Sequence, residues 1–582
     1  MALSLLLITA SSKAQIPVAS PSPDLPDLAT EIAATGNLEL ASQLFARAVQ
    51  VAETIEDKAT KINALSAIAI KLGEVGQTQK ANLIFDRAIQ VSKQTDDNFT
   101  LYYQEPARRD IAIAMAKAGI IQRALQFIET INSDFRQAEA LNAIAPILAE
   151  NGETEQARQI LLKALSKARG ITGDYAYEAN GSCGNDKFEV LSKIAANLSL
   201  LNQFDTALEV AKSVTGCSSA NGDSSEDYQA WAYLGILANM ANAEQVKPTW
   251  IGSQTMQNGS EKMPVWSQIG QKLAAMGEVD LALTVAEKIS QEFQTVTAIN
   301  SGLDLREFGE KERSLSRIAI ELAKKQQFET ALKIAQTIQE LTPEQEAAVK
   351  QFNLQTQPSI KALTLGEIAR EYAKIGKIEP ALQLVNSIGN QEGKALGIIA
   401  IAQGLQTTGQ AAQADKLLSQ NLQPPAIPPT DNFEANQSIS RIAVALVTVG
   451  KVDQALQIAQ SIKNDTTKEQ AIANIASQLS EMGQMERAFQ IANAVNSVGF
   501  KQEALNKIAA KYLELGQLEQ ASQVTKLIPA DSNIDILANL ADGFAKAGKT
   551  EQALQVAQTI ANDSVKAIAI ANVAAMLVPK NN

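Results

Sequence analysis

Two cysteines and a regularly spaced set of cationic and amide side chains are the residues of this 582-residue chain that could do chemistry. The chain contains no histidine, which excludes Ser-His-Asp and Cys-His catalysis and histidine-ligated metal sites. Two cysteines are too few for an all-cysteine zinc site. Phosphate-binding loops, the HExxH motif and calcium loops are also missing from the sequence. The sequence therefore predicts a protein that is not an enzyme and that carries no metal and no cofactor.

Cys183 and Cys217 lie in two Gly-, Ser- and Asn-rich segments on either side of one predicted helical hairpin. The first precedes a helix predicted at about 187–201, and the second follows a helix predicted at about 204–214, so both lie at the same end of the hairpin. Flexible neighbours would let the two α-carbons approach within about 7 Å, which a disulfide requires. We therefore predict a Cys183–Cys217 disulfide and an oxidising compartment. The alternative is a pair of reduced, unrelated thiols.

The elements that position these residues follow from one repeated pattern, Gly-x-x-x-x-Ala. Thirteen copies occur along the chain, and Asn202 and Gln326 replace the glycine in two of them. Seven residues before the turn position stands a small residue, eight before stands Ile or Leu, and a larger apolar residue usually stands four before. Such spacings place the residues on one stripe of a helix. Each unit is therefore predicted to be helix A, a left-handed turn and helix B, with stripes buried by stacking.

This pattern resembles the tetratricopeptide repeat (TPR) over roughly residues 25–580. The small residue, the glycine and the following alanine have the TPR spacing, and the last four turns are 33, 33 and 32 residues apart. Segments 44–52 and 84–92 also carry the aromatic residue and second alanine of TPR helix B, which later copies lack. The predicted fold is an all-α, right-handed superhelical solenoid of about 13–14 stacked antiparallel hairpins. We predict an open array rather than a toroid or compact bundle, because toroids have fewer hairpins and an aromatic-lined funnel.

The domain organisation follows from composition. A short apolar run before Ser12-Lys13-Ala14 predicts an export signal, although no basic residue precedes the run. The protein is then periplasmic or extracellular, and otherwise cytoplasmic. The predicted segments are a signal peptide (1–14), a Pro-rich linker (15–27), irregular repeats (28–422), a Pro-rich insert (423–433), regular repeats (434–562) and a terminal capping helix and tail (563–582).

Insertions are predicted between helix B of one unit and helix A of the next, with a lone or degenerate helix A at 228–243. In one interpretation these insertions are only tolerated and have no function. In the other, at least one of them carries function, because loops on a rigid scaffold often do. The predicted insertions are 96–110, 170–186, 215–227, 246–266 and 423–433.

In a TPR-like stack, helix A lines the concave face, which implies a binding surface. Four cations there share one position and would suit the backbone or carboxylate groups of an extended peptide. Ordinary surface polarity is the alternative interpretation. The candidate concave-face residues are Lys193, Arg317, Arg441, Asn474, Lys507 and Asn539.

The predicted function is a non-catalytic scaffold that binds a protein or extended peptide. One alternative is a self-assembling structural protein joined through the apolar helix at 564–578, which would otherwise be a cap. A less favoured alternative is a carboxylate-based hydrolase with its site in the inserts at 96–110 or 170–188. A net charge of −12 predicts no nucleic-acid partner. No stretch has the length of an integral membrane segment, and the oligomeric state stays open.

Overall fold

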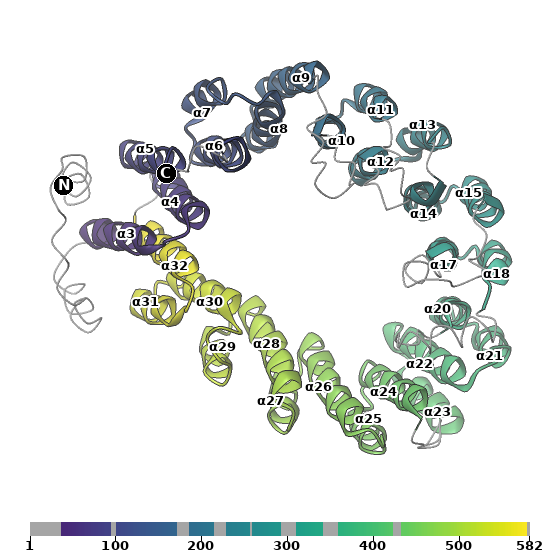
Figure 1. Cartoon of the computed structure of the whole chain (residues 1–582). Coiled ribbons are helices and arrows are strands. Elements are labelled where there is room, and N and C mark those ends of the chain that lie inside the picture. The colour runs from purple at the N-terminus through teal and green to yellow at the C-terminus, as the bar shows by residue number, and fades with distance from the viewer. Residues whose placement is uncertain are drawn as a thin grey trace. The chain divides into compact units, whose positions relative to one another are not determined.

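The computed structural model describes residues 37–94, 100–171, 186–214, 228–256, 259–292, 310–340, 359–422 and 432–578. Within these ranges the chain forms 28 α-helices and no β-strand (Figure 1). The all-α repeat of helical hairpins predicted from the sequence is confirmed. The predicted signal peptide, the Pro-rich linker, the first helix A and both cysteines lie outside the described residues.

The turn between helix A and helix B is left-handed at every predicted position that the structure describes. Ten glycines have φ between 69° and 86°, and the two replacements, Asn202 and Gln326, have φ of 58° and 62°. At Gly76, the following Gln77 N–H donates to the Leu72 carbonyl oxygen at 2.8 Å, which closes the end of the helix. A β-carbon costs free energy in this conformation, so glycine is the residue that fits it.

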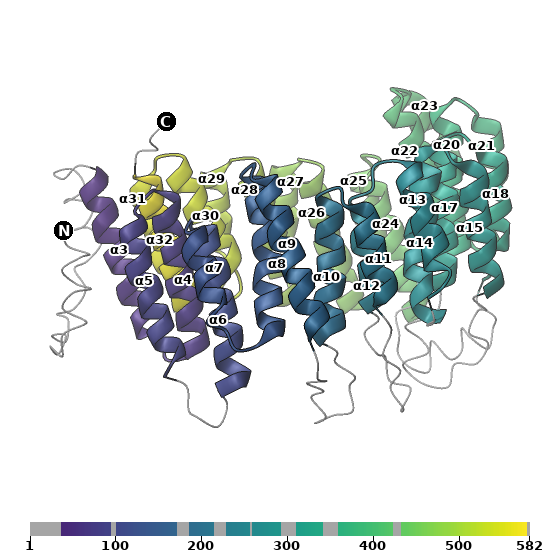
Figure 2. The same cartoon turned by 90° about the horizontal axis from the view of Figure 1, so that it is seen from above.

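The helices fall into two contact units, of which the first comprises Met1–Gly173 and Leu505–Asn582. Successive A helices contact one another, and each B helix contacts the next A helix, so that A and B helices form two layers. Figure 2 shows helices α3 to α9 side by side. The A helices are α4 (Lys58–Glu74), α6 (Thr100–Lys117), α8 (Asp134–Glu150), α30 (Ile534–Lys546) and α32 (Asp563–Met576). The B helices are α3 (Asn37–Thr54), α5 (Thr78–Ser92), α7 (Ile121–Ile128), α9 (Thr154–Gly170), α29 (Leu518–Thr525) and α31 (Thr550–Thr559).

The second unit, Asp174–Ala504, repeats the same arrangement with helices that are consecutive in the chain. Helix α28 (Val498–Glu514) crosses the boundary between the two units. The A helices are α10 (Asp186–Leu200), α12 (Tyr228–Ala238), α14 (Gly259–Met276), α17 (Glu310–Lys324), α20 (Ile360–Lys374), α22 (Gln391–Thr407), α24 (Phe433–Val447) and α26 (Asp465–Glu481). The B helices are α11 (Phe204–Ser213), α13 (Ala243–Ser253), α15 (Val279–Glu292), α18 (Phe328–Thr337), α21 (Ile378–Asn386), α23 (Ala411–Asn421), α25 (Val452–Gln460) and α27 (Met485–Asn493).

The core of each hairpin is the stripe predicted from the spacing. In α4, Ile68, Ala69 and Leu72 are all 0% exposed. Small residues set the distance between helices: a β-carbon on Gly366 of α20 would stand 3.3 Å from the Gly397 α-carbon of α22. Small residues in the A helices therefore let neighbouring helices approach closely.

One hairpin was not predicted, and two predicted insertions are partly wrong. Helices α12 and α13 form an ordinary pair, so the segment 246–266 is mostly the end of helix B and the start of the next helix A. Similarly, α6 begins at Thr100, so most of the predicted insert 96–110 is the first part of a helix. The other predicted insertions fall largely outside the described residues.

Prolines at 248 and 264 caused this error, because proline inside a helix removes a hydrogen bond. Two other features overcome that cost. Asn242 and Gln245 form a capping box that starts α13. Trp250 and Trp266 pack edge to face, with ring centroids 5.2 Å apart, and are 6% and 1% exposed.

The last helix, α32, differs most from what the sequence predicts. It contacts α30 and α31, which precede it, but also α3 and α4 from the start of the described chain. Its Ala567, Ala571 and Ala574 are 0% exposed. The hypothesis of an exposed docking face on this helix is therefore wrong. Within the first unit the first and last described helices thus pack together, a contact that the sequence did not predict.

Candidate functional site

The six candidate residues named from the sequence lie nine positions before the turn residue of their A helices. We call this set the exposed row: Lys193, Arg317, Arg441, Asn474, Lys507 and Asn539. Arg441 and Asn474 are half-buried and the other four are exposed. The residue that follows each of them is an Ile or Leu that is 0% or 1% exposed. The row therefore lies beside the buried stripe without being part of it.

Arg441 on α24 is held by a carboxylate on the neighbouring helix α22. Its Nε and Nη2 lie 2.5 Å and 2.9 Å from the two carboxylate oxygens of Glu392. The Ser438 hydroxyl donates to the same carboxylate at 2.7 Å. Such a two-point contact fixes both side chains, so a ligand would have to displace Glu392 to reach Arg441.

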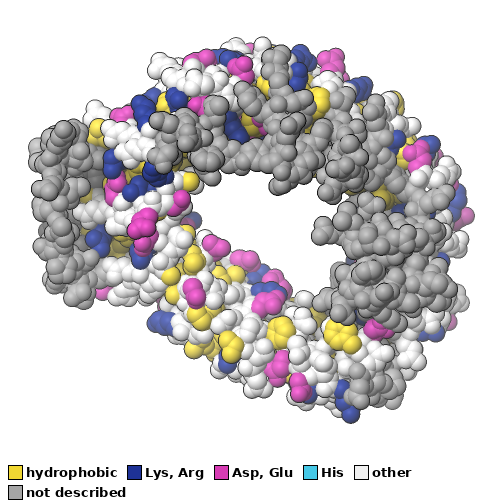
Figure 3. All heavy atoms as spheres, viewed as in Figure 1, with side chains coloured by type: hydrophobic (Ala, Val, Ile, Leu, Met, Phe, Trp, Pro, Cys, Tyr) yellow, Lys and Arg dark blue, Asp and Glu magenta, His cyan; other side chains and the backbone are white. Residues whose placement is uncertain are grey.

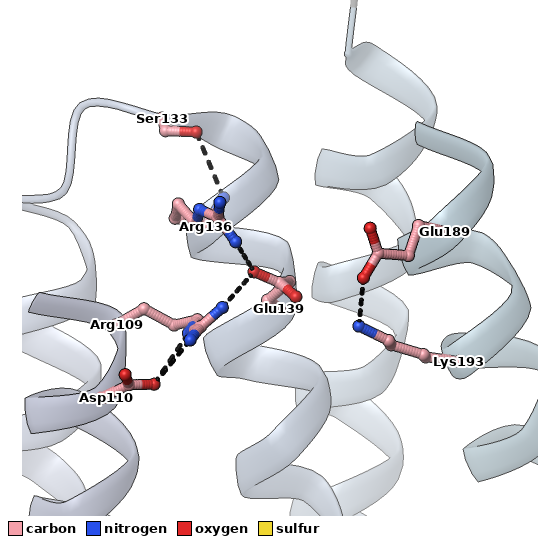
Figure 4. A network of polar contacts seen from close by, with 7 residues as sticks. All are labelled: Arg109, Asp110, Ser133, Arg136, Glu139, Glu189 and Lys193. Atoms are coloured by element: carbon pink, nitrogen blue, oxygen red, sulfur yellow. Dashed lines mark hydrogen bonds and ion pairs between the residues drawn. The ribbon is translucent and has the colours of Figure 1, made fainter. Parts of the chain in front are cut away.

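The other two cations of the row in the second unit differ from Arg441. Lys193 forms an ion pair of 2.5 Å with Glu189, four residues before it on α10 (Figure 4). Both side chains are substantially exposed, so water screens this pair and it contributes little. Arg317 on α17 is exposed and has no hydrogen bond or ion pair with another described residue. Among the cations of the exposed row in the second unit, Arg317 is therefore the one that is exposed and has no partner within the described residues.

A denser charged cluster lies on α6 and α8 of the first unit, and the sequence did not single it out (Figure 4). Glu139 accepts hydrogen bonds from Arg109 at 2.8 Å and from Arg136 at 2.6 Å, both on the same Oε2. Arg109 also donates from Nε to Asp110 at 2.9 Å. The cluster joins two neighbouring A helices through one carboxylate that is only 8% exposed. Its net charge is zero, so it stabilises the helix pair rather than offering a free charge.

The pKa values of Glu139 and Arg109 both move in the direction that favours the charged form. Burial raises the pKa of Glu139, but the hydrogen bonds and charges of Arg109 and Arg136 outweigh it and hold the pKa below its usual value. Burial lowers the pKa of Arg109, and the contact with Glu139 outweighs it so that the pKa is raised. Glu139 and Arg109 are therefore both charged at neutral pH.

The pKa of a second carboxylate, Glu367 on α20, is shifted in the opposite direction from that of Glu139. Arg370 Nη2 lies 2.6 Å from Glu367, while Arg370 Nε also faces Glu371 at 3.6 Å. Burial raises the pKa of Glu367, and the charge of Glu371 adds to the effect, although Arg370 and nearby lysines oppose it. One arginine shared by two carboxylates is thus a weaker partner than the two arginines around Glu139.

Two further carboxylates, the buried Glu105 and the half-buried Glu469, have structural tasks. Glu105 on α6 is 4% exposed and accepts the backbone N–H of Asn132 at 2.9 Å, just before α8 begins. Glu469 on α26 accepts the backbone N–H of Asn496 at 2.7 Å in the same way, just before α28. Both stand fourteen positions before their turn residue, so the contact recurs with the repeat. These carboxylates order the connection to the next helix A and are not candidates for acid–base catalysis.

The B helices carry a separate set of ion pairs that connect one repeat to the next. Arg87 on α5 lies 2.7 Å from Glu53 on α3, and Lys333 on α18 lies 2.8 Å from Glu287 on α15. These pairs are exposed or half-buried, so each contributes little to stability. On the face that Figure 3 shows, basic and acidic side chains are likewise interspersed.

Two further classes of site were searched among the described residues. No group of three or more His, Cys, Asp or Glu side chains is arranged there to hold a metal ion. No helix in the described ranges is long and apolar enough to cross a bilayer. The proposed Cys183–Cys217 disulfide lies outside the described residues, and nothing in the fold tests it.

Comparisons with known proteins give only distant likenesses. No protein-family model matches the chain, and no curated protein matches it. Among solved structures, Ton1535 from Thermococcus onnurineus NA1 is 16% identical, covers 69% of this chain and 98% of its own, and has a TM-score of 0.23. Cut9, solved as the APC/C heterotetramer Cut9–Hcn1, is 14% identical, with coverage of 81% and 83% and a TM-score of 0.24.

The pentatricopeptide repeat protein PPR10, solved with an 18-nt RNA element, is 13% identical. It covers 96% of this chain and 88% of its own, with a TM-score of 0.27. Overlaps of this size carry no argument about function, and the assignment as a helical-repeat protein rests on the helices themselves.

Proposed function

We propose that the chain is a non-catalytic scaffold that binds a protein or an extended peptide along its A helices. The observation that carries this proposal is the exposed row, whose polar side chains recur at one register beside a buried stripe. A repeat array places equivalent side chains at regular intervals, which suits an extended ligand. Amide side chains such as Asn474 and Asn539 can both donate to and accept from a peptide backbone.

Arg317 is the expected anchor for an acidic group of the partner. A guanidinium offers five donors in a planar fork, which matches a carboxylate in two-point contact. Arg441 already has such a contact with Glu392, so it reports the geometry that a ligand carboxylate would adopt at Arg317. The partner is therefore proposed to be a peptide or protein segment that carries Asp or Glu.

The test is binding of a fluorescent acidic-peptide library to the full chain, followed by fluorescence anisotropy. Arg317→Glu is expected to weaken binding at least about tenfold, because it replaces an attraction with a repulsion. Lys333→Glu is the matched control, because Lys333 is exposed on the B helix of the same hairpin. Equal losses in both variants would contradict the proposal. Binding of single-stranded RNA that is lost in Arg317→Glu would replace the peptide with RNA as the partner.

Self-assembly through α32 has less support than the scaffold function, because the apolar residues of α32 are buried against helices of the same chain. A hydrolase site has less support as well. The described part of the predicted insert 96–110 is helical, and its Glu105 is engaged with backbone N–H groups. Light scattering across a range of protein concentrations separates self-assembly from the scaffold function.

We also propose that the protein is exported and that Cys183 and Cys217 form a disulfide. Three described features support the pairing: α10 begins at Asp186, α11 ends at Ser213, and these two helices contact one another. Each cysteine is thus only three or four residues from the same hairpin. Thiol titration of the unreduced, denatured protein is expected to find no free thiol. Two free thiols would contradict the disulfide.

A further inference from the structure

Trp231 on α12 stands in the same register as the exposed row, on a helix that has no left-handed turn after it. The residues one, two and five positions after Arg317 are 0% exposed, and the same holds for the residues one, two and five positions after Trp231. In α12 these buried residues are Ala232, Tyr233 and Ile236. Trp231 therefore has in α12 the place that Arg317 has in α17, and it is 44% exposed.

The indole of Trp231 is both accessible and held in place. The chain contains three tryptophans, and the other two, Trp250 and Trp266, are 6% and 1% exposed. The Trp231 ring packs edge to face on Tyr228, with ring centroids 5.3 Å apart, and Tyr228 is 2% exposed. A buried neighbour of this kind restricts the indole, so less conformational entropy is lost when a ligand covers it. Exposed tryptophans with such support are typical binding hot spots.

The charge beside Trp231 favours an uncharged ligand group. Helices α10 and α12 approach closely where a β-carbon on Gly235 would stand 2.5 Å from the β-carbon of Ala196. Trp231 and Lys193 stand four and three residues before this crossing, which places both about one turn from it. Glu189, the partner of Lys193, stands one further turn away. A cation placed over the indole would thus meet the Lys193 ammonium first, so we expect an apolar side chain there.

The distance between Trp231 and Arg317 follows from the packing of the A helices. Helix α12 contacts α14, and α14 contacts α17, in the order that Figure 1 shows. Helices packed side by side are about 8–10 Å apart, so two such steps separate the two positions by about 16–20 Å. An extended peptide covers about 3.3 Å per residue, so about five or six residues span this distance.

We propose that Trp231 binds an apolar side chain of the acidic peptide that Arg317 anchors, about five or six residues from the peptide's carboxylate. This inference rests on the proposed function and adds the second residue that the partner carries. A Leu or Phe side chain gains from burying apolar area against the indole. Between the two positions, the half-buried Gln268 of α14 stands in the same register and offers its amide to the peptide backbone.

The test varies the peptide first. Fluorescein-labelled Gly-Ser peptides with one Asp-Glu pair and one Leu at different distances from it are titrated with the full chain, followed by fluorescence anisotropy. The affinity is expected to be highest when about five or six residues separate the Leu from the acidic pair. Replacement of that Leu by Gly or by Arg is expected to weaken binding at least about tenfold.

Variants of the chain test the same contact from the other side. Trp231→Ala should remove the preference for Leu, so that the Leu and Gly peptides bind within about twofold of each other. Trp231→Phe should retain most of the preference, because an aromatic ring remains. Ile251→Ala is the matched control, because Ile251 is 67% exposed on α13, the helix B that pairs with α12. This control should leave every affinity within about twofold of the unmodified chain.

Tryptophan fluorescence gives a measurement that needs no variant. Acrylamide quenching reports mainly on Trp231, because the other two tryptophans are buried. Saturation with the unlabelled Leu peptide should lower the quenching constant at least about twofold, whereas the Gly peptide should leave it unchanged.

The outcomes separate this inference from the proposed function. Peptides whose binding is weakened by Arg317→Glu, but is unaffected by the Leu or by Trp231→Ala, would overturn the inference and leave the proposed function standing. Failure of every acidic peptide to bind would overturn both. Protection of Trp231 from acrylamide by single-stranded oligouridine, with none by the Leu peptide, would overturn the inference in favour of a base stacked on the indole.

Discussion

The two contact units of this chain use the same hairpin, but they differ in the residues that form its turns and in the partners of their carboxylates. All five described turns of the first unit are glycines, and its buried Glu139 has two arginine partners. The second unit contains both non-glycine turns, Asn202 and Gln326. It also contains Glu367, with its raised pKa. Buried side-chain atoms without a hydrogen-bond partner among the described residues occur in both units, for example Gln137 Oε1 in the first and the Tyr233 hydroxyl in the second.

Chain connectivity differs in the opposite sense. The first unit joins two segments that are far apart in the sequence, and its α3–α32 pair has no turn. Bringing such segments together costs more loop-closure entropy than closing a short hairpin. The second unit has its helices in consecutive order. The comparison indicates that local strain is tolerated where helices are consecutive, whereas the discontinuous unit has well-satisfied turns and charges.

The largest expected effect comes from Phe45→Ala in α3 compared with Phe85→Ala in α5. Both rings are 0% exposed and stand nine positions after their turn residue, so each loss should cost about 3–5 kcal/mol. In Phe45→Ala, α32 is expected to lose protection together with α3, because no turn keeps the two helices together. In Phe85→Ala, α4 should retain part of its protection. Hydrogen exchange of each helix measures the difference, and identical patterns would remove the distinction between the two kinds of hairpin.

A smaller effect is expected from neutralising the two carboxylates. Glu139→Gln should cost about 1.5–3 kcal/mol at neutral pH, because it weakens two hydrogen bonds to charged groups. Since the pKa of Glu139 is lowered on folding, its contribution is present above the usual value of 4.5 and is lost as pH falls through the folded pKa. Thermal unfolding at pH 7 and at pH 3 should therefore show a smaller difference between variant and unmodified protein at pH 3.

Glu367→Gln is the matched test in the second unit and should have the opposite sign. The pKa of Glu367 is raised on folding, so its contribution is present below 4.5 and is lost as pH rises through the folded pKa. At neutral pH the substitution is expected to be neutral or slightly stabilising. A cost as large as that of Glu139→Gln would show that the single Arg370 contact stabilises Glu367 as much as two arginines stabilise Glu139. The two units would then not differ in how their carboxylates contribute to stability.

The sequence predicted the repeated features of the fold and missed the features that depend on pairs of helices. Glycine turns, the apolar stripe and the left-handed state of Asn202 and Gln326 are local, so their spacing was enough. The α12–α13 hairpin was missed because its connection ends with the capping residue Asn242 and contains no turn with positive φ among the described residues. A repeated sequence pattern therefore predicts the turns and stripes that depend on neighbouring residues, and it misses features that depend on how two helices pair.

The candidate site shows the same limit. The exposed row was predicted from register alone, and its six residues do lie beside the buried stripe. The pairing of Arg441 with Glu392 and that of Glu139 with Arg109 were not predicted, because each partner comes from a neighbouring helix whose axial offset is set by packing. The contact of α32 with α3 was missed for the same reason, although Val573 and Ala574 already placed α32 in the A register.

Gln326→Gly should stabilise the second unit by about 1 kcal/mol. The substitution removes the cost of a β-carbon at φ of 62°, and the greater entropy of glycine in the unfolded chain offsets part of the gain. Asn202→Gly should gain less, because asparagine tolerates this conformation better than glutamine. Chemical denaturation followed for α17 and α18 measures the effect. Gly76→Gln provides the reverse control in the first unit and should destabilise it, so a neutral result there would mean that the turns are not strained.

The smallest expected effect is that of Tyr233→Phe, which removes a buried hydroxyl without changing the ring. Tyr233 is 0% exposed and its oxygen has no partner among the described residues, so the substitution should be neutral or stabilise by less than about 1 kcal/mol. Burial raises the pKa of Tyr233 to about 12. Because the unfolded state ionises first, near pH 10, this tyrosine makes stability fall as pH rises through 10 to 12. The variant should therefore lose less stability over that interval, as measured by urea denaturation at pH 9 and pH 11. A cost of more than about 1 kcal/mol at pH 9 would mean that the hydroxyl has a partner, and would contradict the interpretation that it is buried without one.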